Sequence, residues 1–277
     1  MALWARRGQS YVGAMASTAL AASAPLWQWD EPSGRLVETT GEHPVIVDSW
    51  LLWHGRVRGY DLHWARFAGS IAEYGINDVA AFRAATEAIL PRGGLWFPRL
   101  ELHLDPRPRV AVRLRPAPDL MRSARVWVYA GPDPRRQPSR KGPDFKVQEA
   151  LRQAAKDHGA DEAILLDEAG RVREGVFSNV LWWDGADLCT AADDGSILPG
   201  ITRRLILERC ADLEVRVRYR CAPPDRLAER EVWITSALHG IRWVSAWDGR
   251  PAPEIHTRRF NAFRAYLTSV LRPLPLQ

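Results

Sequence analysis

The segment between residues 162 and 190 contains three short apolar runs separated by turn residues. Gly170 interrupts the first pair of runs, and an Asp-Gly pair at Gly185 interrupts the second. Apolar runs of this length, bounded by glycine and aspartate, are typical of antiparallel strands joined by tight turns. Hydrophobic residues make up 46% of the 277 residues, which excludes a chain that is disordered throughout. The sequence therefore predicts a folded protein built around an antiparallel sheet.

The rest of the chain predicts a second structural unit before this sheet. Alternating apolar residues within 99–115 predict two antiparallel strands, and apolar residues at 147, 150, 151 and 154 predict a helix over 146–157. The stretch 131–140 is rich in proline and arginine, which favours a linker. We expect an α+β fold of two domains, divided into a disordered leader at 1–30, a small α/β domain at 31–131, a linker at 132–140, and a larger, mostly antiparallel domain at 141–277.

The basic charge leaves more than one class of partner open. The formal net charge is +5, and of 38 lysines and arginines only Lys141, Lys146 and Lys156 are lysines, so 38 − 3 = 35 are arginines. A nucleic-acid-binding protein is one alternative. Against it, acidic residues are interspersed with the arginines and no nucleic-acid-binding motif is found. An anionic small substrate is another alternative, because arginine pairs bidentately with carboxylate and phosphate.

The sequence disfavours a membrane-spanning protein, a metalloprotein and a disulfide-bonded protein. No stretch reaches the roughly 18 apolar residues that a membrane-spanning helix needs. The histidines lack metal-ligand spacing, so we expect no metal site. The odd number of cysteines, Cys189, Cys210 and Cys221, argues against a disulfide framework and favours a reducing, cytoplasmic location.

Three separated pieces of sequence could carry chemistry. Lys141 follows the predicted linker, where ligand clefts often form, although an ordinary solvated lysine is the simpler interpretation. Glu174 lies between two apolar residues of a predicted strand, which favours either a buried carboxylate or a surface ion pair. The sequence Leu-Pro-Gly-Ile-Thr at 198–202 opens a helix whose free N–H groups could bind an anion, unless Thr202 simply caps it.

In this order and spacing, the pieces resemble the class IV, fold type IV, pyridoxal-phosphate (PLP) enzymes. That family includes 4-amino-4-deoxychorismate lyases and branched-chain and D-amino acid aminotransferases. The resemblance is carried by Lys-Gly-Pro-Asp from 141, Glu-Gly at 174, Ser-Asn at 178 and Leu-Pro-Gly-Ile-Thr-Arg at 198–203. A weaker likeness continues through the His-Trp-Ala-Arg-Phe segment at 63–67.

The resemblance implies roles for particular residues. Lys141 would hold the cofactor as a Schiff base and move protons, Glu174 would face the pyridine nitrogen, and Arg66 would bind the phosphate. Ser49 would occupy a hydroxyl position and protonate the leaving group. The complete cofactor-binding set implied is Arg66, Lys141, Glu174, Ser178, Asn179, Ile201, Thr202, Ser236 and Ala237. A homodimer and a small, carboxylate-bearing amine substrate are also implied, with no membrane or nucleic-acid partner.

The reaction implied is elimination of pyruvate from 4-amino-4-deoxychorismate to give 4-aminobenzoate. The motivating feature is Ser-Ala-Leu-His-Gly at 236–240, which is similar to the corresponding turn of the lyases. Transamination of a branched-chain or D-amino acid is the alternative. The substrate carboxylate could meet any of four arginines, namely Arg56, Arg58, Arg113 and Arg242.

Overall fold

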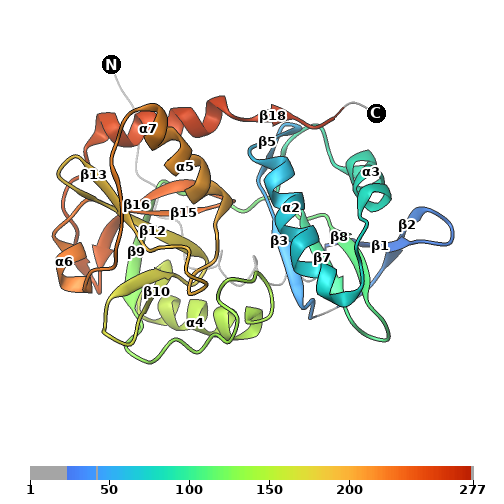
Figure 1. The fold of residues 1–277 in the computed structure, drawn as a ribbon, viewed down its shortest axis with the longest axis horizontal. Helices are drawn as coiled ribbons and strands as arrows, with labels where there is room; N and C mark the ends of the chain where they lie inside the picture. The colour runs from blue at the N-terminus through green and yellow to red at the C-terminus, as the bar shows by residue number, and fades with distance from the viewer. Residues whose placement is uncertain (1–23, 42, 276–277) are drawn as a thin grey trace, which may run out of the picture.

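Two lobes lie side by side in the computed structural model, which describes residues 24–41 and 43–275 (Figure 1). The first lobe contains helices α2 (Tyr60–Ile71) and α3 (Ala80–Ile89) and the short 3₁₀ helix η1 (Ala72–Tyr74). Its strands are β1 (Leu26–Asp30), β2 (Arg35–Thr39), β3 (Ile46–Ser49), β4 (Leu52–Trp53), β5 (Arg56–Val57), β6 (Leu95–Trp96), β7 (Arg99–His103), β8 (Arg109–Arg113) and β18 (Arg272–Pro273).

The second lobe is larger. Its helices are α4 (Phe145–Asp157), α5 (Ile201–Asp212), α6 (Pro224–Ala228) and α7 (Thr257–Ser269). Its strands are β9 (Ser123–Val128), β10 (Glu162–Leu166), β11 (Val172–Gly175), β12 (Ser178–Asp184), β13 (Asp187–Thr190), β14 (Val217–Tyr219), β15 (Val232–Ser236), β16 (Gly240–Trp247) and β17 (Arg250–Pro251).

The sheets confirm an α+β architecture with mostly antiparallel strands. In the first lobe the main sheet has the order β2-β1-β8-β7-β3, and a smaller sheet has the order β18-β5-β4-β6. In the second lobe the order is β11-β10-β9-β16-β15-β12-β13-β14, and β11 also pairs with β12, so part of this sheet closes on itself. The predicted hairpin within 99–115 is present as antiparallel β7 and β8.

Each lobe has its own apolar core. In the first lobe, α2 packs Trp64 and Phe67 onto the sheet, where both are almost completely buried. In the second lobe, Trp233 of β15 contacts Phe260 and Phe263 of α7 in edge-to-face geometry, which aromatic rings favour. Helices α2 and α7 therefore each pack on a sheet of their own lobe. None of the helices within the described ranges is long and apolar enough to span a membrane.

The structure differs from the expected domain boundaries in three places. Of the expected leader at 1–30, residues 1–23 lie outside the described residues, but 26–30 form β1, which pairs with β2 and β8 because Leu26 is buried there. Strand β9, expected in the small domain, belongs to the large sheet. Strand β18 returns to the first lobe and pairs with β5. We therefore propose a lobe boundary between β8 and β9.

Candidate active site

A cavity between the lobes collects the residues singled out in the sequence. Its wall includes every cofactor-binding residue that the resemblance implies, from both lobes: Arg66, Lys141, Glu174, Ser178, Asn179, Ile201, Thr202, Ser236 and Ala237. These residues lie between positions 66 and 237 of the chain, yet the fold gathers them around one space. Ser49, the expected catalytic hydroxyl, is buried in β3 and is not on this wall.

Lys141 is fixed against the first lobe through its backbone. Its carbonyl oxygen accepts a hydrogen bond of 2.8 Å from Val47 N of β3. Gly142 makes this approach possible: its φ is +132°, and a Cβ there would lie 2.6 Å from the Val45 carbonyl oxygen. The Lys141 side chain is partly buried, and its pKa is lowered to about 8 by burial and by the neighbouring cation of Arg66. Much of the amine is therefore a free nucleophile near pH 8.

The Arg66 guanidinium of α2 is held in position by a buried carboxylate, Asp48, which the sequence did not indicate as a site residue. Asp48 of β3 accepts hydrogen bonds from Arg66 Nε at 2.8 Å and Nη2 at 3.0 Å, and its Oδ1 lies 2.7 Å from His63 Nδ1. Although burial opposes ionisation, Arg66 and His63 hold the pKa of Asp48 well below its usual range. The remaining Arg66 Nη1 donates to the Pro199 carbonyl oxygen at 3.0 Å, which places the guanidinium at the start of α5.

The N-terminus of α5 is open toward the cavity. Its N-cap is Gly200, which provides no side-chain cap, and the Thr202 hydroxyl donates to the Ser236 carbonyl oxygen at 2.9 Å rather than capping the helix. The ordinary N-cap expected for Thr202 is therefore absent. Position 200 has room only for glycine, because a Cβ there would lie 1.9 Å from Asn179 Oδ1. Free N–H groups at a helix start, with Arg66 beside them, form a site for a phosphate-like anion.

Glu174 is buried, which decides between the two alternatives that the sequence left open, and its charged partner is a residue that the sequence did not indicate. Its Oε1 accepts a 2.5 Å hydrogen bond from Arg135 Nη1, and its Oε2 accepts one of 2.9 Å from Asn179 Nδ2. Leu198 N also donates to the carboxylate. Burial raises the pKa of Glu174 to about 7, even though Arg135 favours the charged form. A carboxylate in this setting can accept a proton or a hydrogen bond from a nitrogen of a bound ring.

Arg135 lies within the segment expected to be a linker, and its side chain is buried there. Asp133 accepts hydrogen bonds from Arg135 Nε at 3.0 Å and Nη2 at 2.8 Å, and the Asp144 carboxylate accepts from the backbone N–H groups of the next two residues. The loop is therefore held in place as part of the cavity wall. Its Pro and Arg content alone does not reveal this, because the two carboxylates that organise it act through side-chain contacts.

None of the four arginines suggested for the substrate carboxylate is on the cavity wall. Arg113 pairs with Glu101 at 2.7 Å, and Arg242 pairs with Glu162 at 3.4 Å. Arg56 and Arg58 donate to backbone carbonyl oxygens of Leu271 and Ala237. Each of the four therefore has at least one partner within the protein, although the buried Nε of Arg58 has none among the described residues.

The residues present fit a planar cofactor with an anionic group at one end. Besides the open helix start, the buried hydroxyl of Thr235 lines the cavity and has no hydrogen-bond partner within the described residues. Buried polar groups of folded proteins are nearly always paired, so an unpaired hydroxyl beside a cavity indicates a ligand. The amine of Lys141, the anion site at α5 and the carboxylate of Glu174 supply the groups that would hold an aldehyde, a phosphate and a ring nitrogen.

Comparison with known proteins agrees with this arrangement. Residues 46–247 match the family model of amino-transferase class IV, which is more than half of the chain. The aminodeoxychorismate lyase of Bacillus subtilis (strain 168) is 37% identical over 78 residues, 28% of this chain and 27% of that protein. The mitochondrial branched-chain-amino-acid aminotransferase 1 of Arabidopsis thaliana is 34% identical over 103 residues, 36% of this chain and 27% of that protein. These alignments thus span about a quarter of the length of either relative.

Solved structures show the same fold over nearly the whole chain. A hypothetical aminotransferase from Mycobacterium tuberculosis, in its PLP-bound form, superposes with a TM-score of 0.76 at 18% identity, covering 90% of this chain and 98% of that one. The branched-chain amino acid aminotransferase from Escherichia coli gives 0.75 at 18% identity, covering 91% and 99%. Taken with the family match, these findings establish that the chain belongs to the class IV aminotransferase family.

Proposed function

We propose that this protein is a PLP-dependent enzyme that eliminates pyruvate from 4-amino-4-deoxychorismate, leaving 4-aminobenzoate. The observation that carries the cofactor assignment is the convergence of Lys141, Glu174 and the uncapped start of α5 on one cavity. The lyase activity is supported by the alignment with the Bacillus subtilis aminodeoxychorismate lyase and by the Ser-Ala-Leu-His-Gly turn, of which Ser236 and Ala237 line the cavity.

In this proposal each residue has a separate task. When bound, PLP withdraws electrons from the carbon next to the substrate nitrogen. Arg66 and the N–H groups of Ile201 and Thr202 hold the phosphate, which fixes the position of the ring. Glu174, kept in place by Arg135, accepts a hydrogen bond from the ring nitrogen. Asn179 orients Glu174 from the opposite side.

Lys141 would carry out the proton transfer. Its Nζ takes the proton from the substrate ring carbon that bears the nitrogen, the bond from the ring to the enolpyruvyl oxygen breaks, and the ring becomes aromatic. The departing enolpyruvate gains a proton and becomes pyruvate, so the atoms of the substrate are divided completely between two products. Ser49 is not on the cavity wall; its Oγ accepts a hydrogen bond from Arg115 Nη2 at 3.3 Å. We therefore assign the base to Lys141 and leave Ser49 out of the mechanism.

Transamination is the second candidate, because the Arabidopsis relative and the Escherichia coli structure are aminotransferases by name. The two reactions leave different products. Purified protein would be mixed with 4-amino-4-deoxychorismate, and pyruvate and 4-aminobenzoate would be measured together. Equal amounts of both support the lyase. Cofactor-loaded protein that releases neither, but forms a keto acid from an amino donor and an acceptor, supports the aminotransferase.

The lowered pKa of Lys141 predicts the pH dependence of cofactor capture. Only the free amine attacks an aldehyde, so the rate at which apoprotein binds PLP covalently should rise with pH and level off above about 8. Stopped-flow absorbance over about pH 6 to pH 10 measures this rate. An inflection near the ordinary lysine value of 10.5 would show that the Lys141 amine does not experience the burial and the Arg66 charge described above.

We further propose that the protein is a cytoplasmic homodimer. The three cysteines are all unpaired thiols, and Cys189 and Cys210 are buried, which suits a reducing compartment. Sedimentation of the purified protein tests the dimer.

A further inference from the structure

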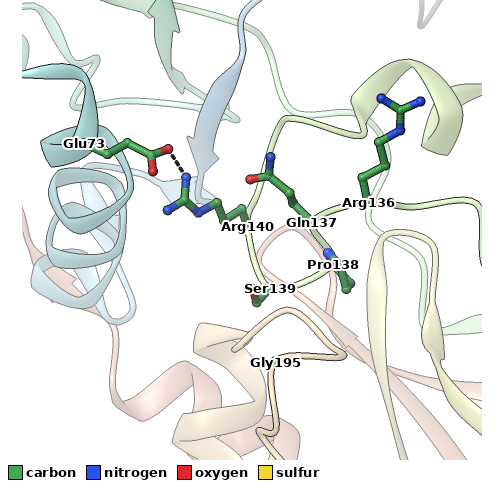
Figure 2. A pocket seen from close by; sticks show the side chains of 7 residues that line it. All are labelled: Glu73, Arg136, Gln137, Pro138, Ser139, Arg140 and Gly195. Atoms are coloured by element: carbon green, nitrogen blue, oxygen red, sulfur yellow. Dashed lines mark hydrogen bonds and ion pairs between the residues drawn. The ribbon is translucent and has the colours of Figure 1, made fainter.

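A second cavity, of about 410 Å³ (Figure 2), adjoins the candidate active site, and the two are called here the outer and the inner cavity. It is lined by Glu73 of η1 in the first lobe, by loop residues 136–140 and by Gly195. Pro138 and Arg140 line this outer cavity and the inner cavity alike. The two cavities therefore adjoin at Arg140, next to Lys141, so a ligand that reaches the Lys141 amine in one cavity has the other beside it.

Among the described residues, three arginines line the inner cavity, and each pairs with an acidic residue. Arg140 differs from the other two in how exposed its ion pair is. Arg66 and Arg135 each pair with a carboxylate that is almost completely buried, namely Asp48 and Glu174. Arg140 pairs instead with Glu73, and the two side chains are 34% and 42% exposed. An ion pair at this exposure contributes little to stability, so a competing anion can displace it. Figure 2 shows the Arg140 side chain directed at Glu73 across the cavity.

The charges around the outer cavity favour an anionic ligand. The lining residues include two arginines, Arg136 and Arg140, and one carboxylate, Glu73; Arg140 is directed at Glu73, whereas the Arg136 side chain points away from it (Figure 2). Ser139 and Gln137 add polar side chains. Arginine binds a carboxylate through two parallel, charge-assisted hydrogen bonds, and each of these bonds is stronger than a hydrogen bond between neutral groups.

We propose that the outer cavity binds a carboxylate of the substrate through Arg140, and that Glu73 occupies Arg140 until the substrate replaces it. This inference rests on the proposed function and deepens it: the substrate class is an amine that carries a carboxylate at the end remote from the nitrogen. Arg140 is then a specificity residue for that class, whereas none of Arg56, Arg58, Arg113 and Arg242 lines either cavity.

Two substitutions should change affinity in opposite directions. The probes are 4-aminobenzoate and its uncharged isostere 4-aminobenzamide, titrated calorimetrically into cofactor-loaded protein. Arg140→Gln should weaken 4-aminobenzoate binding by about tenfold and leave 4-aminobenzamide binding unchanged. Glu73→Gln should strengthen 4-aminobenzoate binding by roughly threefold, because the competing carboxylate is gone. Arg204→Gln is the matched control, since Arg204 forms an exposed pair with Glu208 outside both cavities.

The outcomes separate this inference from the proposed function. Protein that acquires no Schiff-base absorbance with PLP would contradict the proposed function itself. Protein that holds PLP but binds 4-aminobenzoate equally well with and without Arg140, or more weakly in Glu73→Gln, would overturn only the assignment of the outer cavity.

Discussion

Lys141→Ala is expected to abolish covalent cofactor binding and to lower the turnover rate by about 10³-fold or more. Lys141 supplies both the amine that captures the aldehyde and the base that moves the substrate proton, so one substitution removes two functions. The side chain is partly buried beside a cavity, and its loss should leave the fold intact. The measurement is the absorbance spectrum of protein mixed with PLP, before and after borohydride reduction, together with the rate of product formation.

The scarcity of lysine provides internal controls for this experiment. Lys146 and Lys156 lie on α4 and are not on the wall of either cavity. Lys146→Ala and Lys156→Ala should therefore retain the cofactor and the activity. Peptide mapping after reduction should find the label on Lys141 alone. A label on either α4 lysine, or full activity in Lys141→Ala, would contradict the assigned site.

Arg135→Met is expected to destabilise the protein by about 3–5 kcal/mol. Arg135 is the partner of buried Glu174 and of Asp133, so its removal leaves a buried carboxylate without a cation. In addition, the pKa of Glu174, already raised to about 7 by burial, should rise further because Arg135 is the charge that opposes this shift. Glu174 would then be protonated at neutral pH. Urea unfolding of the apoprotein measures the stability, and the absorbance of bound PLP against pH reports the carboxylate.

A double variant distinguishes the ion pair from a simple loss of packing. In Arg135→Met with Glu174→Gln the uncompensated charge is absent, so the double variant should be more stable than Arg135→Met alone. Arg136→Met serves as the neighbouring control, because its guanidinium has no acidic partner within 4 Å among the residues described. If Arg135→Met and Arg136→Met unfold at the same urea concentration, the Arg135–Glu174 pair contributes nothing to stability.

Local patterns in the sequence were sufficient for the elements and for much of the cavity. The helix over 146–157 followed from apolar spacing and is present as α4. The three apolar runs predicted between 162 and 190 form four strands, β10, β11, β12 and β13, because the middle run is divided between Gly175 and Ser178. Glu174 was placed on a strand between apolar residues, which is why a buried carboxylate could be anticipated. The prediction for Lys141 depended on the order of Lys141, Glu174 and the start of α5 in the sequence, because no local property distinguishes Lys141 from another loop lysine.

The site residues that the sequence did not indicate, Asp48 and Arg135, act through contacts with residues that are distant in the sequence. Asp48 and Arg66 are 18 positions apart and meet only because α2 packs on β3. Arg135 lies in a segment whose proline content is typical of a linker, and its role depends on Glu174, 39 positions later. The short-range composition of that segment was interpreted correctly as irregular structure, but irregular structure can be rigid when buried ion pairs fix it.

Strand β18 has a consequence for the order in which the molecule can be assembled. It pairs with β5, and Leu274, which follows it, is 2% exposed within the core of the first lobe. A ribosome must release the whole second lobe before this leucine can reach its place. Until then the nascent first lobe has a gap in its apolar interior and an unpaired β5 edge. The first lobe can therefore complete its core only after the chain of the second lobe has been synthesised, although each lobe has a separate sheet.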